Sequence, residues 1–508
     1  MPWLDRAAAL TLCGLSLTAC ATSALDLAPS RADRPWAPAT DAQGEIVAGK
    51  PDRAEVVDAY VLPQNANLPA AQPTPVDPAK AYSLAELIDL AETTNPLTRI
   101  AWDDARRAAL SAGIAESAYL PKITAIAVAG TQATSGRASA LGASVNTGGS
   151  GDGAVSAISL QWLLFDFGER QAIVEAAKQV SIASDIAFTA THQQVIHDVA
   201  VAYYANAAAR ARLATAGQAL KNAQAIEVAA TDRKAHGLGT IVEVAQARQA
   251  TAQANLAVVQ ATGQVDDAYL TLLSAVGVSP LTKIKLMDLP HRTLSKALTR
   301  PVEDIVAASV SRRPDVLSAY AAMKASRAGI RAAQAEFKPK LFVSGVGSYS
   351  TGSLDLPTLP TGGSSAADVN LTGNHFGGSI LAGVSVPLFD GGTRAAALAK
   401  ARAEADSADA RLDRVRDEAI RQIVGSDNAL RTSLSALEAA QSLETTAQTT
   451  FDSALVAYRN GVGPVTDVIL AQTQLLQAQL AAADAYSTAL SAAATLALAT
   501  GALGAAPD

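Results

Sequence analysis

Two long stretches of the chain mix apolar and polar residues without a proline to interrupt them. Residues 170–236 and 394–460 each span 67 positions, contain no proline and hold a single glycine. Their apolar residues are mostly alanine, the strongest helix former. At 1.5 Å per residue, each stretch predicts a helix roughly 100 Å long, far beyond the usual helix of about 11 to 12 residues. Helices of this length are typical of coiled coils and elongated bundles.

Each long helix is followed by a glycine-containing turn and a second helical stretch. The turns read Gly-Leu-Gly-Thr at 237–240 and Gly-Val-Gly-Pro at 461–464, and they predict return helices over 240–276 and 464–500. A shorter helix is expected over 96–119. Placed end to end, the return helix and the shorter helix together measure about 92 Å, so the two can flank one long helix.

The segments between the shorter and the longer helices have a pattern that suits strands. Residues 123–133 and 155–165 are apolar runs on either side of a stretch rich in Gly, Ser, Ala and Asn, and residues 341–350 and 378–388 repeat this arrangement. Each run has about the 9 to 11 residues that a tilted strand needs to cross a membrane. Barrel signals are weak for each segment, so four strands of a soluble sheet are the alternative.

The order of these signals occurs twice along the chain. Three pairs of glycines are separated by 224 residues, at 168 and 392, 237 and 461, and 277 and 501, whereas two pairs of prolines, at 96 and 314 and at 121 and 339, are separated by 218. The six-residue difference therefore falls between the second proline and the Phe-Asp-x-Gly sequence that closes each strand segment. A change in length of this kind belongs in a loop.

The N-terminus is typical of an export signal. Arg6 precedes an apolar run over 7–17, which is too short to span a bilayer permanently and leads into Leu-Thr-Ala-Cys. This ending resembles a bacterial lipobox, which implies cleavage before Cys20 and a lipid anchor on its thiol; Ala21 in place of Asp implies transfer to the outer membrane. The alternative is an ordinary signal peptide with an incidental cysteine. Cys13 lies inside the signal, so structural disulfides and thiolate metal sites are excluded.

Composition and charge exclude further classes. The chain is 49% hydrophobic but only 4% aromatic, and its formal net charge is −7 with a pI near 5.4. No basic cluster accompanies aromatic residues, so no nucleic acid partner is expected. The histidines have no metal-ligand spacing and no nucleophile motif occurs, so we expect no catalytic residue, no metal and no cofactor. The function is therefore inferred from the duplicated strands and helices.

Taken together, the duplicated Phe-Asp-x-Gly with a following Arg and the duplicated Gly-x-Gly turns resemble the TolC family of outer-membrane channels. The resemblance covers Tyr82 to Gly501. It implies an α+β membrane protein: a homotrimer whose four strands per chain form one 12-stranded β-barrel in outer-membrane lipid, continued by a long α-helical coiled-coil barrel through the periplasm. A periplasmic adaptor (membrane fusion) protein and an inner-membrane pump are the implied partners. Four strands alone would leave open edges in lipid, which is consistent with a shared barrel.

The resulting domain organisation has five parts. We expect a lipoprotein signal peptide over 1–19, a lipid-anchored Pro-rich segment over 20–80, a first repeat over 81–277, an equatorial connector over 278–302 and a second repeat over 303–508. In the first repeat the strand hairpin is expected over 122–165, and in the second over 340–389.

Function is expected at three kinds of position. The lipid anchor is Cys20. The helix-to-helix turns would face the adaptor, although they can equally be plain tight turns; their residues are Gly237, Gly239, Thr240, Gly461, Gly463 and Pro464. By resemblance, Asp467 matches an acidic constriction position and Leu470 stands where many members carry a second Asp, with Glu243 as the first-repeat counterpart of Asp467. A solvated Asp on a helix face is the alternative for Asp467.

The sequence leaves the cargo open. Small-molecule or metal efflux through a proton-driven pump is the first choice, because a lipid anchor is common in that branch of the family. Type I protein or polysaccharide secretion is the second. A lipid-anchored periplasmic coiled-coil adaptor or scaffold would explain the helices but would not need two strand hairpins, and an envelope enzyme lacks a convergent polar cluster.

Overall fold

The computed structural model describes two separate units of the chain. The described residues are 28, 32, 36, 38–47, 61–62, 64–65, 67–70, 72–140, 143–289, 293–294, 301–357 and 368–503. One unit ends at Pro75 and the other begins at Val76, five residues before the expected end of the Pro-rich segment. The expected signal peptide over 1–19 and Cys20 lie outside the described residues.

The first unit contains a small hairpin within the Pro-rich segment, a composition that favours extended chain. Strand β1 (Ala39–Thr40) pairs antiparallel with β2 (Ile46–Val47). The carboxylate of Asp41 accepts hydrogen bonds from the backbone N–H groups of Gln43 (2.9 Å) and Glu45 (2.8 Å). Aspartate often closes turns in this way, so local turn chemistry outweighs the extended tendency of the flanking prolines.

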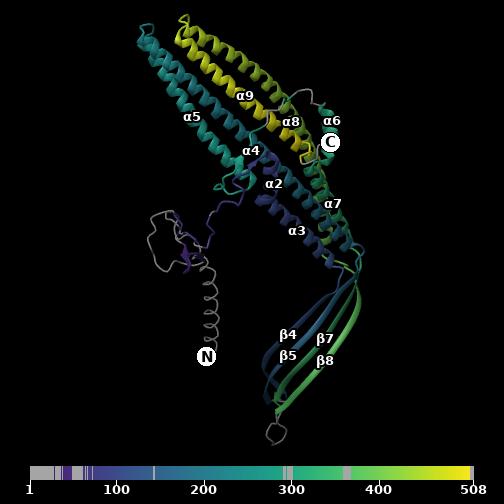
Figure 1. Ribbon diagram of the computed structural model, residues 1–508. Coiled ribbons are helices and arrows are strands. Elements are labelled where there is room, and N and C mark those ends of the chain that lie inside the picture. The colour runs from purple at the N-terminus through teal and green to yellow at the C-terminus, as the bar shows by residue number, and fades with distance from the viewer. Residues whose placement is uncertain are drawn as a thin grey trace. The chain divides into compact units, whose positions relative to one another are not determined.

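Four helices form the body of the second unit. Helices α4 (Glu169–Ala235) and α8 (Thr393–Arg459) have 67 residues each, and they return through α5 (Ile241–Val276) and α9 (Val465–Ala499). Both connecting turns lie at the same end of the helices (Figure 1). At 1.5 Å per residue, α4 and α8 are each about 100 Å long.

Small side chains at regular spacing allow these helices to pack closely. In α5 the buried residues Ala247, Ala254 and Ala261 recur every seven positions, and Ala471 and Ala478 are their buried counterparts in α9. A seven-residue repeat keeps one stripe of each helix facing its neighbour, as in coiled coils. Because alanine fills this stripe, the backbones approach each other without a bulky core.

The second unit also contains shorter helices. They are α2 (Leu84–Thr94), α3 (Pro96–Ser117), α6 (Val302–Ser309) and α7 (Pro314–Ala335), with a single 3-10 turn, η3 (Val310–Arg312), before α7. The Asn95 side chain caps α3 through the Leu97 N–H (2.9 Å) and donates to the Ala275 carbonyl (3.0 Å), so it joins the start of α3 to the end of α5. In the second repeat, Arg313 donates to the Ala499 carbonyl at 2.6 Å and makes the equivalent joint.

Four long strands extend from the other end of the helices in the order β4-β5-β7-β8, all antiparallel. They are β4 (Lys122–Ala140), β5 (Ala143–Phe165), β7 (Lys340–Pro357) and β8 (Asp368–Ser385). The expectation of strands of 9 to 11 residues was wrong, because the ladders continue into the Gly- and Ser-rich stretches that separate the apolar runs. Backbone pairing does not require apolar side chains, so hydropathy marks only part of each strand. The second hairpin also ends earlier than 389, at Ser385.

The two hairpins have the same register throughout. Lys122 lies opposite Gln161 and Lys340 opposite Ser385, and at the far end Ser139 lies opposite Ser144 and Pro357 opposite Asp368. Each β7 residue is therefore 218 positions after its β4 counterpart, and each β8 residue 224 after its β5 counterpart. The length difference between the repeats lies beyond the last of these pairs, at the hairpin ends.

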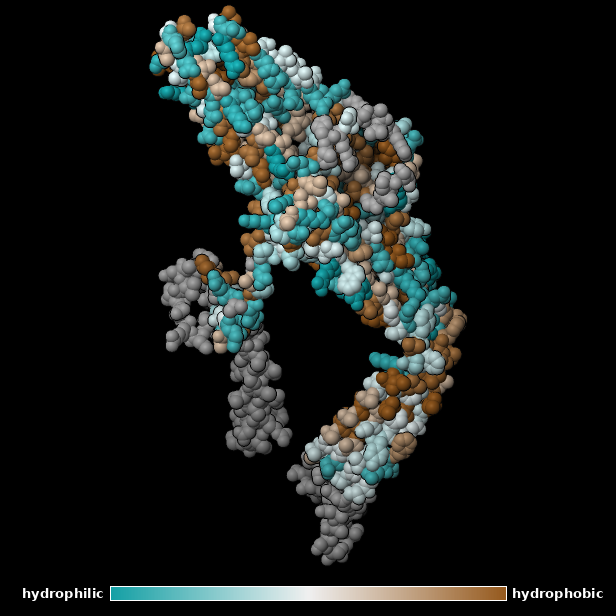
Figure 2. All heavy atoms as spheres, in the orientation of Figure 1, coloured by the Kyte–Doolittle hydropathy of each residue, from teal (hydrophilic) through white to brown (hydrophobic). Residues whose placement is uncertain are grey.

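The two faces of the sheet differ in polarity. Residues that lie opposite each other share a face. One face carries Leu160, Trp162, Tyr349, Phe376 and Ile380, whereas the other mixes polar residues, among them Gln161, Ser344 and His375, with apolar ones such as Ile126 and Leu381. Hydrophobic residues gather on the half of the sheet next to the helices, and paler and hydrophilic residues lie farther out (Figure 2). An apolar band on one face of a sheet is typical of a transmembrane barrel wall.

Part of the equatorial connector packs against the middle of α4. Strand β3 (Ala81–Tyr82) pairs in parallel with β6 (Lys285–Leu286), and the Tyr203 hydroxyl donates to the Met287 carbonyl at 2.9 Å. A buried cluster that includes Tyr82, Leu87 and Leu272 surrounds this contact. Of the expected connector over 278–302, the structure describes 278–289, 293–294 and 301–302.

Candidate functional site

The first predicted turn closes α4 and opens α5 with a complete set of hydrogen bonds. Gly237 has a φ of 72°, in the left-handed region that favours glycine. The Leu238 N–H donates to the Arg233 carbonyl at 2.8 Å, which satisfies one of the carbonyls that a helix end leaves open. The Thr240 hydroxyl accepts from the Glu243 N–H at 3.2 Å, and the Glu243 carboxylate accepts from the Thr240 N–H at 3.4 Å.

The second predicted turn has the same backbone path but a weaker start to its return helix. Gly461 has a φ of 80°, and the Val462 N–H donates to the Ala457 carbonyl at 3.0 Å. Pro464 is the residue before α9 and makes no side-chain cap. The two turns are thus related by the repeat, but only the first has a reciprocal cap.

The second glycine of each turn lies against the end of the long helix. A Cβ atom on Gly239 would lie 2.9 Å from the Glu243 carboxylate, and one on Gly463 would lie 3.3 Å from the Ala457 Cβ. Between the glycines, the side chains of Leu238 and Val462 are 69% and 82% exposed. Each turn therefore presents one apolar side chain on a tightly built backbone.

Arg233 connects the two turns, which the sequence analysis did not predict. Its guanidinium donates to the Tyr458 carbonyl (3.3 Å) and to the Leu238 carbonyl (3.2 Å), and it lies 5.2 Å from the centre of the Tyr458 ring. Burial and then the nearby Glu243 raise the pKa of Tyr458 above its ordinary value. The available signal was a break in the repeat, because the counterpart of Arg233 is Ala457.

The three expected constriction residues lie close to these turns. Asp467 and Leu470 are exposed and three positions apart on α9, so they share a face, while Val468 between them is fully buried. Glu243 is half-buried and serves as the cap of α5. A capping role thus accounts for Glu243, whereas a ring of Asp467 and Leu470 side chains stays a prediction.

A buried ion pair joins the strands to the helices. In the Phe-Asp-x-Gly element, the Arg170 guanidinium donates to the Asp166 carboxylate at 2.7 Å, and the two side chains are 9% and 7% exposed. Arg170 also lies over the Tyr119 ring at 5.0 Å. Its remaining N–H groups reach three carbonyls at the ends of α3 and β5, those of Ala118 (3.1 Å), Leu163 (2.6 Å) and Leu164 (3.2 Å). One side chain thus holds together the helix end, the strand end and the start of α4.

The second repeat contains the same joint in a more exposed form. Arg394 donates to Asp390 at 2.6 Å and to the Pro387 carbonyl at 3.0 Å. Hydrogen bonds from Arg394 lower the pKa of Asp390. Burial raises the pKa of Asp166, but the side-chain and backbone hydrogen bonds from Arg170 outweigh burial, so its pKa also lies below the ordinary value.

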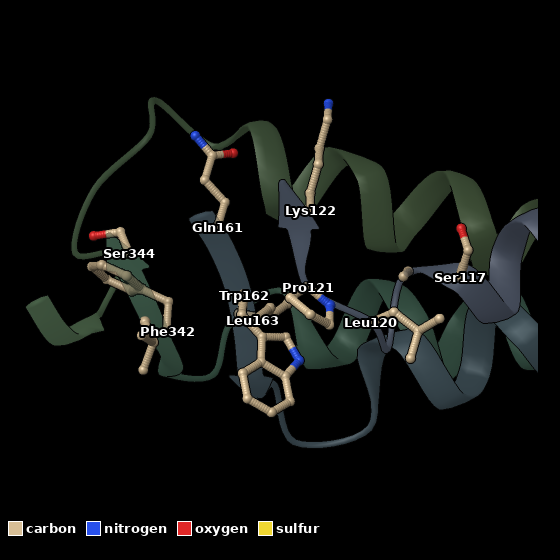
Figure 3. Close-up of a pocket in the computed structure, with 11 residues that line it drawn as sticks. Ser117, Leu120, Pro121, Lys122, Gln161, Trp162, Leu163, Phe342 and Ser344 are labelled. Atoms are coloured by element: carbon tan, nitrogen blue, oxygen red, sulfur yellow. The ribbon is translucent and has the colours of Figure 1, made fainter. Parts of the chain in front are cut away.

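A cavity of about 930 Å³ lies at this joint, between the end of α3, the first residues of β4 and β7 and the last residues of β5. Figure 3 shows Lys122 and Gln161 extending to one side of the strands and the Trp162 ring to the other. The Trp162 ring N–H donates to the Tyr119 carbonyl at 2.9 Å. The lining thus combines apolar rings with single polar groups, and in the described part of the chain no three His, Cys, Asp or Glu side chains gather as a metal site.

Among the residues that the structure describes, no helix is both long enough and apolar enough to cross a bilayer.

Comparison with known proteins gives the same architecture. The family model described as outer membrane efflux protein matches residues 87–278 and 306–502, one match for each repeat. Protein CyaE of Bordetella pertussis is 28% identical over 413 residues, which cover 80% of this chain and 81% of CyaE. A probable outer membrane lipoprotein, SilC of Salmonella typhimurium, is 26% identical and covers 63% of this chain and 66% of its own.

Among solved structures, the outer membrane protein VceC of Vibrio cholerae aligns with a TM-score of 0.65 at 22% identity, over 82% of this chain and 96% of VceC. The likeness at this identity concerns the fold. The two matches of the family model cover the two repeats of the chain. The chain therefore belongs to the outer membrane efflux protein family, and its place is the outer membrane.

Proposed function

We propose that three copies of the chain close into a 12-stranded barrel and a continuous helical tunnel that serves as the outer-membrane duct of a tripartite export system. The observation that carries this proposal is the four-stranded sheet, which has one apolar face and, in the described part of the chain, no strand beyond β4 or β8. Such a sheet is stable in lipid only when its edges are paired. Copies of the same chain supply matching edges.

The helix-to-helix turns are proposed as the docking surface for a periplasmic adaptor protein, which in turn contacts an inner-membrane pump. Leu238 and Val462 support this assignment, because each is an exposed apolar side chain held on a backbone fixed by glycines and hydrogen bonds. A rigid apolar anchor of this kind is suited to a pocket on a partner.

Asp467 and Leu470 are proposed to line the narrow end of the tunnel. Three Asp467 carboxylates would form a ring that attracts cations, next to a ring of apolar Leu470 side chains. We infer small-molecule or metal cargo from the expected lipid anchor at Cys20; protein or polysaccharide cargo is the alternative. The description of the relative SilC as a probable outer membrane lipoprotein supports the anchor.

The test uses the full-length chain purified from membranes in detergent. We expect the mass of a trimer and single-channel conductance in planar bilayers. Asp467→Asn should lower the preference for cations over anions, and the isosteric change Asp452→Asn, on an exposed part of α8, is the matched control. A monomer that needs no detergent and gives no conductance would support a coiled-coil scaffold and overturn the duct.

A further inference from the structure

The joint between the two repeats inside the chain is a template for a joint between copies. Inside the chain, β5 of the first repeat pairs with β7 of the second, with Gln161 opposite Ser344 and Trp162 opposite Val343. In the repeat, β8 is the counterpart of β5, and β4 is the counterpart of β7. The outer edge of β8 therefore corresponds to the β5 side of the internal joint, and the outer edge of β4 corresponds to its β7 side.

The constant offsets turn this equivalence into a register. Because β8 follows β5 by 224 positions and β7 follows β4 by 218 along their whole lengths, Gln161 corresponds to Ser385 (161 + 224) and Ser344 to Ile126 (344 − 218). The next pair, Leu160 and Gly345 inside the chain, likewise gives Val384 and Ala127.

The side chains at the helical part of the joint support the same equivalence. Ala328 of α7 is fully buried, whereas its counterpart in α3, Leu110, is 66% exposed. Ala172 of α4 is 4% exposed and lines a cavity together with α7, whereas its counterpart Ala396 of α8 is exposed. The positions that the internal joint covers are therefore uncovered in the outer halves, and an apolar leucine occupies one of them.

We propose that a second copy of this chain pairs its β4 edge with β8 of the first copy in the register that places Ser385 opposite Ile126 of the next copy, with α3 of that copy against α8. This proposal rests on the duct proposed above and specifies how its copies join. The register keeps the apolar faces of both sheets on one side: Val384 and Ala127 share the apolar face, and Ser385 and Ile126 share the other. A slip by one residue would reverse the faces of the incoming sheet.

The joint between copies lacks one contact that the internal joint has. Lys340 at the start of β7 forms an ion pair with Glu169 at the start of α4, at 2.5 Å. Their counterparts in the outer halves are Lys122 and Thr393, so no carboxylate stands at the equivalent place. The copies are therefore held together by pairing and packing at this level, without the ion pair that ties the two repeats.

Cysteine cross-linking tests the register in the full-length chain in membranes. Ile126→Cys with Ser385→Cys tests the proposed pair on one face, and Ala127→Cys with Val384→Cys tests it on the other face, because neighbouring pairs alternate in Cα separation and one suits a disulfide better. The two cysteines of a chain lie on opposite edges of its sheet, three strand spacings or about 14 Å apart, so a disulfide within one chain is excluded.

We expect mild oxidation to give disulfide-linked oligomers for at least one of these two variants. The matched controls move one partner by two residues on the same face, Ser385→Cys with Val128→Cys and Val384→Cys with Ala129→Cys, and each single-cysteine variant controls for Cys20. Preferential cross-linking of the shifted pairs in an intact oligomer would overturn the register but leave the duct standing. A monomer under native conditions, with no cross-link in any variant, would overturn both.

Discussion

Gly239 and Gly217 differ in the space that the structure leaves for a side chain. A Cβ on Gly239 would lie 2.9 Å from the Glu243 carboxylate, which would have to move, whereas at Gly217 in the middle of α4 no atom outside the local helix backbone lies within 4 Å of the place of a Cβ. The two glycines therefore have opposite roles, although both are followed by helical residues in the sequence.

Alanine at these two glycines should move stability in opposite directions. Gly239→Ala displaces the Glu243 carboxylate and breaks the reciprocal cap with Thr240, which should cost about 0.5–2 kcal/mol. Gly217→Ala should stabilise the helix by about 0.5–1 kcal/mol, because glycine in a helix interior is unfavourable. Denaturant unfolding followed by circular dichroism measures both; equal effects would contradict the packing assigned to Gly239.

Arg170 is expected to be the most sensitive single residue of the strand-to-helix joint. Arg170→Met removes the guanidinium that pairs with the buried Asp166 carboxylate and donates to three carbonyls, and breaking a buried pair costs about 3–5 kcal/mol. Arg394→Met is the matched control in the more exposed joint and should cost less. The same unfolding measurement decides the order, and a larger loss for Arg394→Met would contradict it.

The same pair gives stability that depends on pH. Because the pKa of Asp166 is lowered in the folded chain, the carboxylate stabilises the fold above its unfolded pKa of about 3.9, and this contribution is lost as the pH falls through the folded value. Asp166→Asn should therefore be less stable than the unmodified chain at pH 6, and the gap should narrow below about pH 4. A gap that is constant from pH 6 to pH 3 would contradict the ionised pair.

The elements differ in how well the sequence predicted them. The long helices were expected over 170–236 and 394–460 and are found over 169–235 and 393–459, because glycines in left-handed conformations mark their ends. Helix α2 was missed, although Ser83 and Glu86 form a capping box that the Ser-x-x-Glu spacing announces. The strand lengths were wrong because pairing between Gly- and Ser-rich segments leaves no trace in hydropathy.

Of the candidate site, the sequence predicted the glycines but missed the residue that links the two turns. A turn can be predicted from residues that are neighbours in the sequence, whereas the contact of Arg233 with the Tyr458 carbonyl joins positions 225 apart. No spacing rule relates such positions. The difference between Arg233 and its counterpart Ala457 can be interpreted only from the structure, in which the turn after α4 contacts the end of α8.

Arg233 should set how firmly the two helical hairpins hold together at the turns. Arg233→Gln removes both carbonyl contacts and the ring contact, so the amides of 236–240 and 460–463 should exchange hydrogen faster. Lys234→Gln is the matched control, because it removes a positive charge from the neighbouring residue. Faster exchange in both variants to the same extent would show that charge, and not the contact, matters.

At the scale of the whole molecule, a substitution that adds the missing ion pair to the joint between copies should stabilise the oligomer. Thr393→Glu would place a carboxylate opposite Lys122 of the next copy, as Glu169 stands opposite Lys340 within the chain. Each partly exposed pair contributes about 0.2–1 kcal/mol. The temperature at which the oligomer dissociates in detergent should rise for Thr393→Glu and not for Thr393→Gln, and Lys122→Met should abolish the rise.

The number of copies is the part of the architecture that the fold of one chain does not contain. Alternating faces and open edges require partners, but closure after three depends on the curvature that each joint adds. The trimer was predicted only from the resemblance to a known family. The register of the internal joint then predicts how the strand edges of neighbouring copies pair.

The matched ladders of the two hairpins also restrict how this molecule can change over generations. Unless a β-bulge absorbs it, as the register shift between Leu163 and Phe165 does in β5, a gain or loss of one residue inside a strand turns the later side chains of that strand toward the opposite face. The six-residue difference in length between the two hairpins falls between Pro357 and Asp368, and the register of the two ladders is the same up to that point.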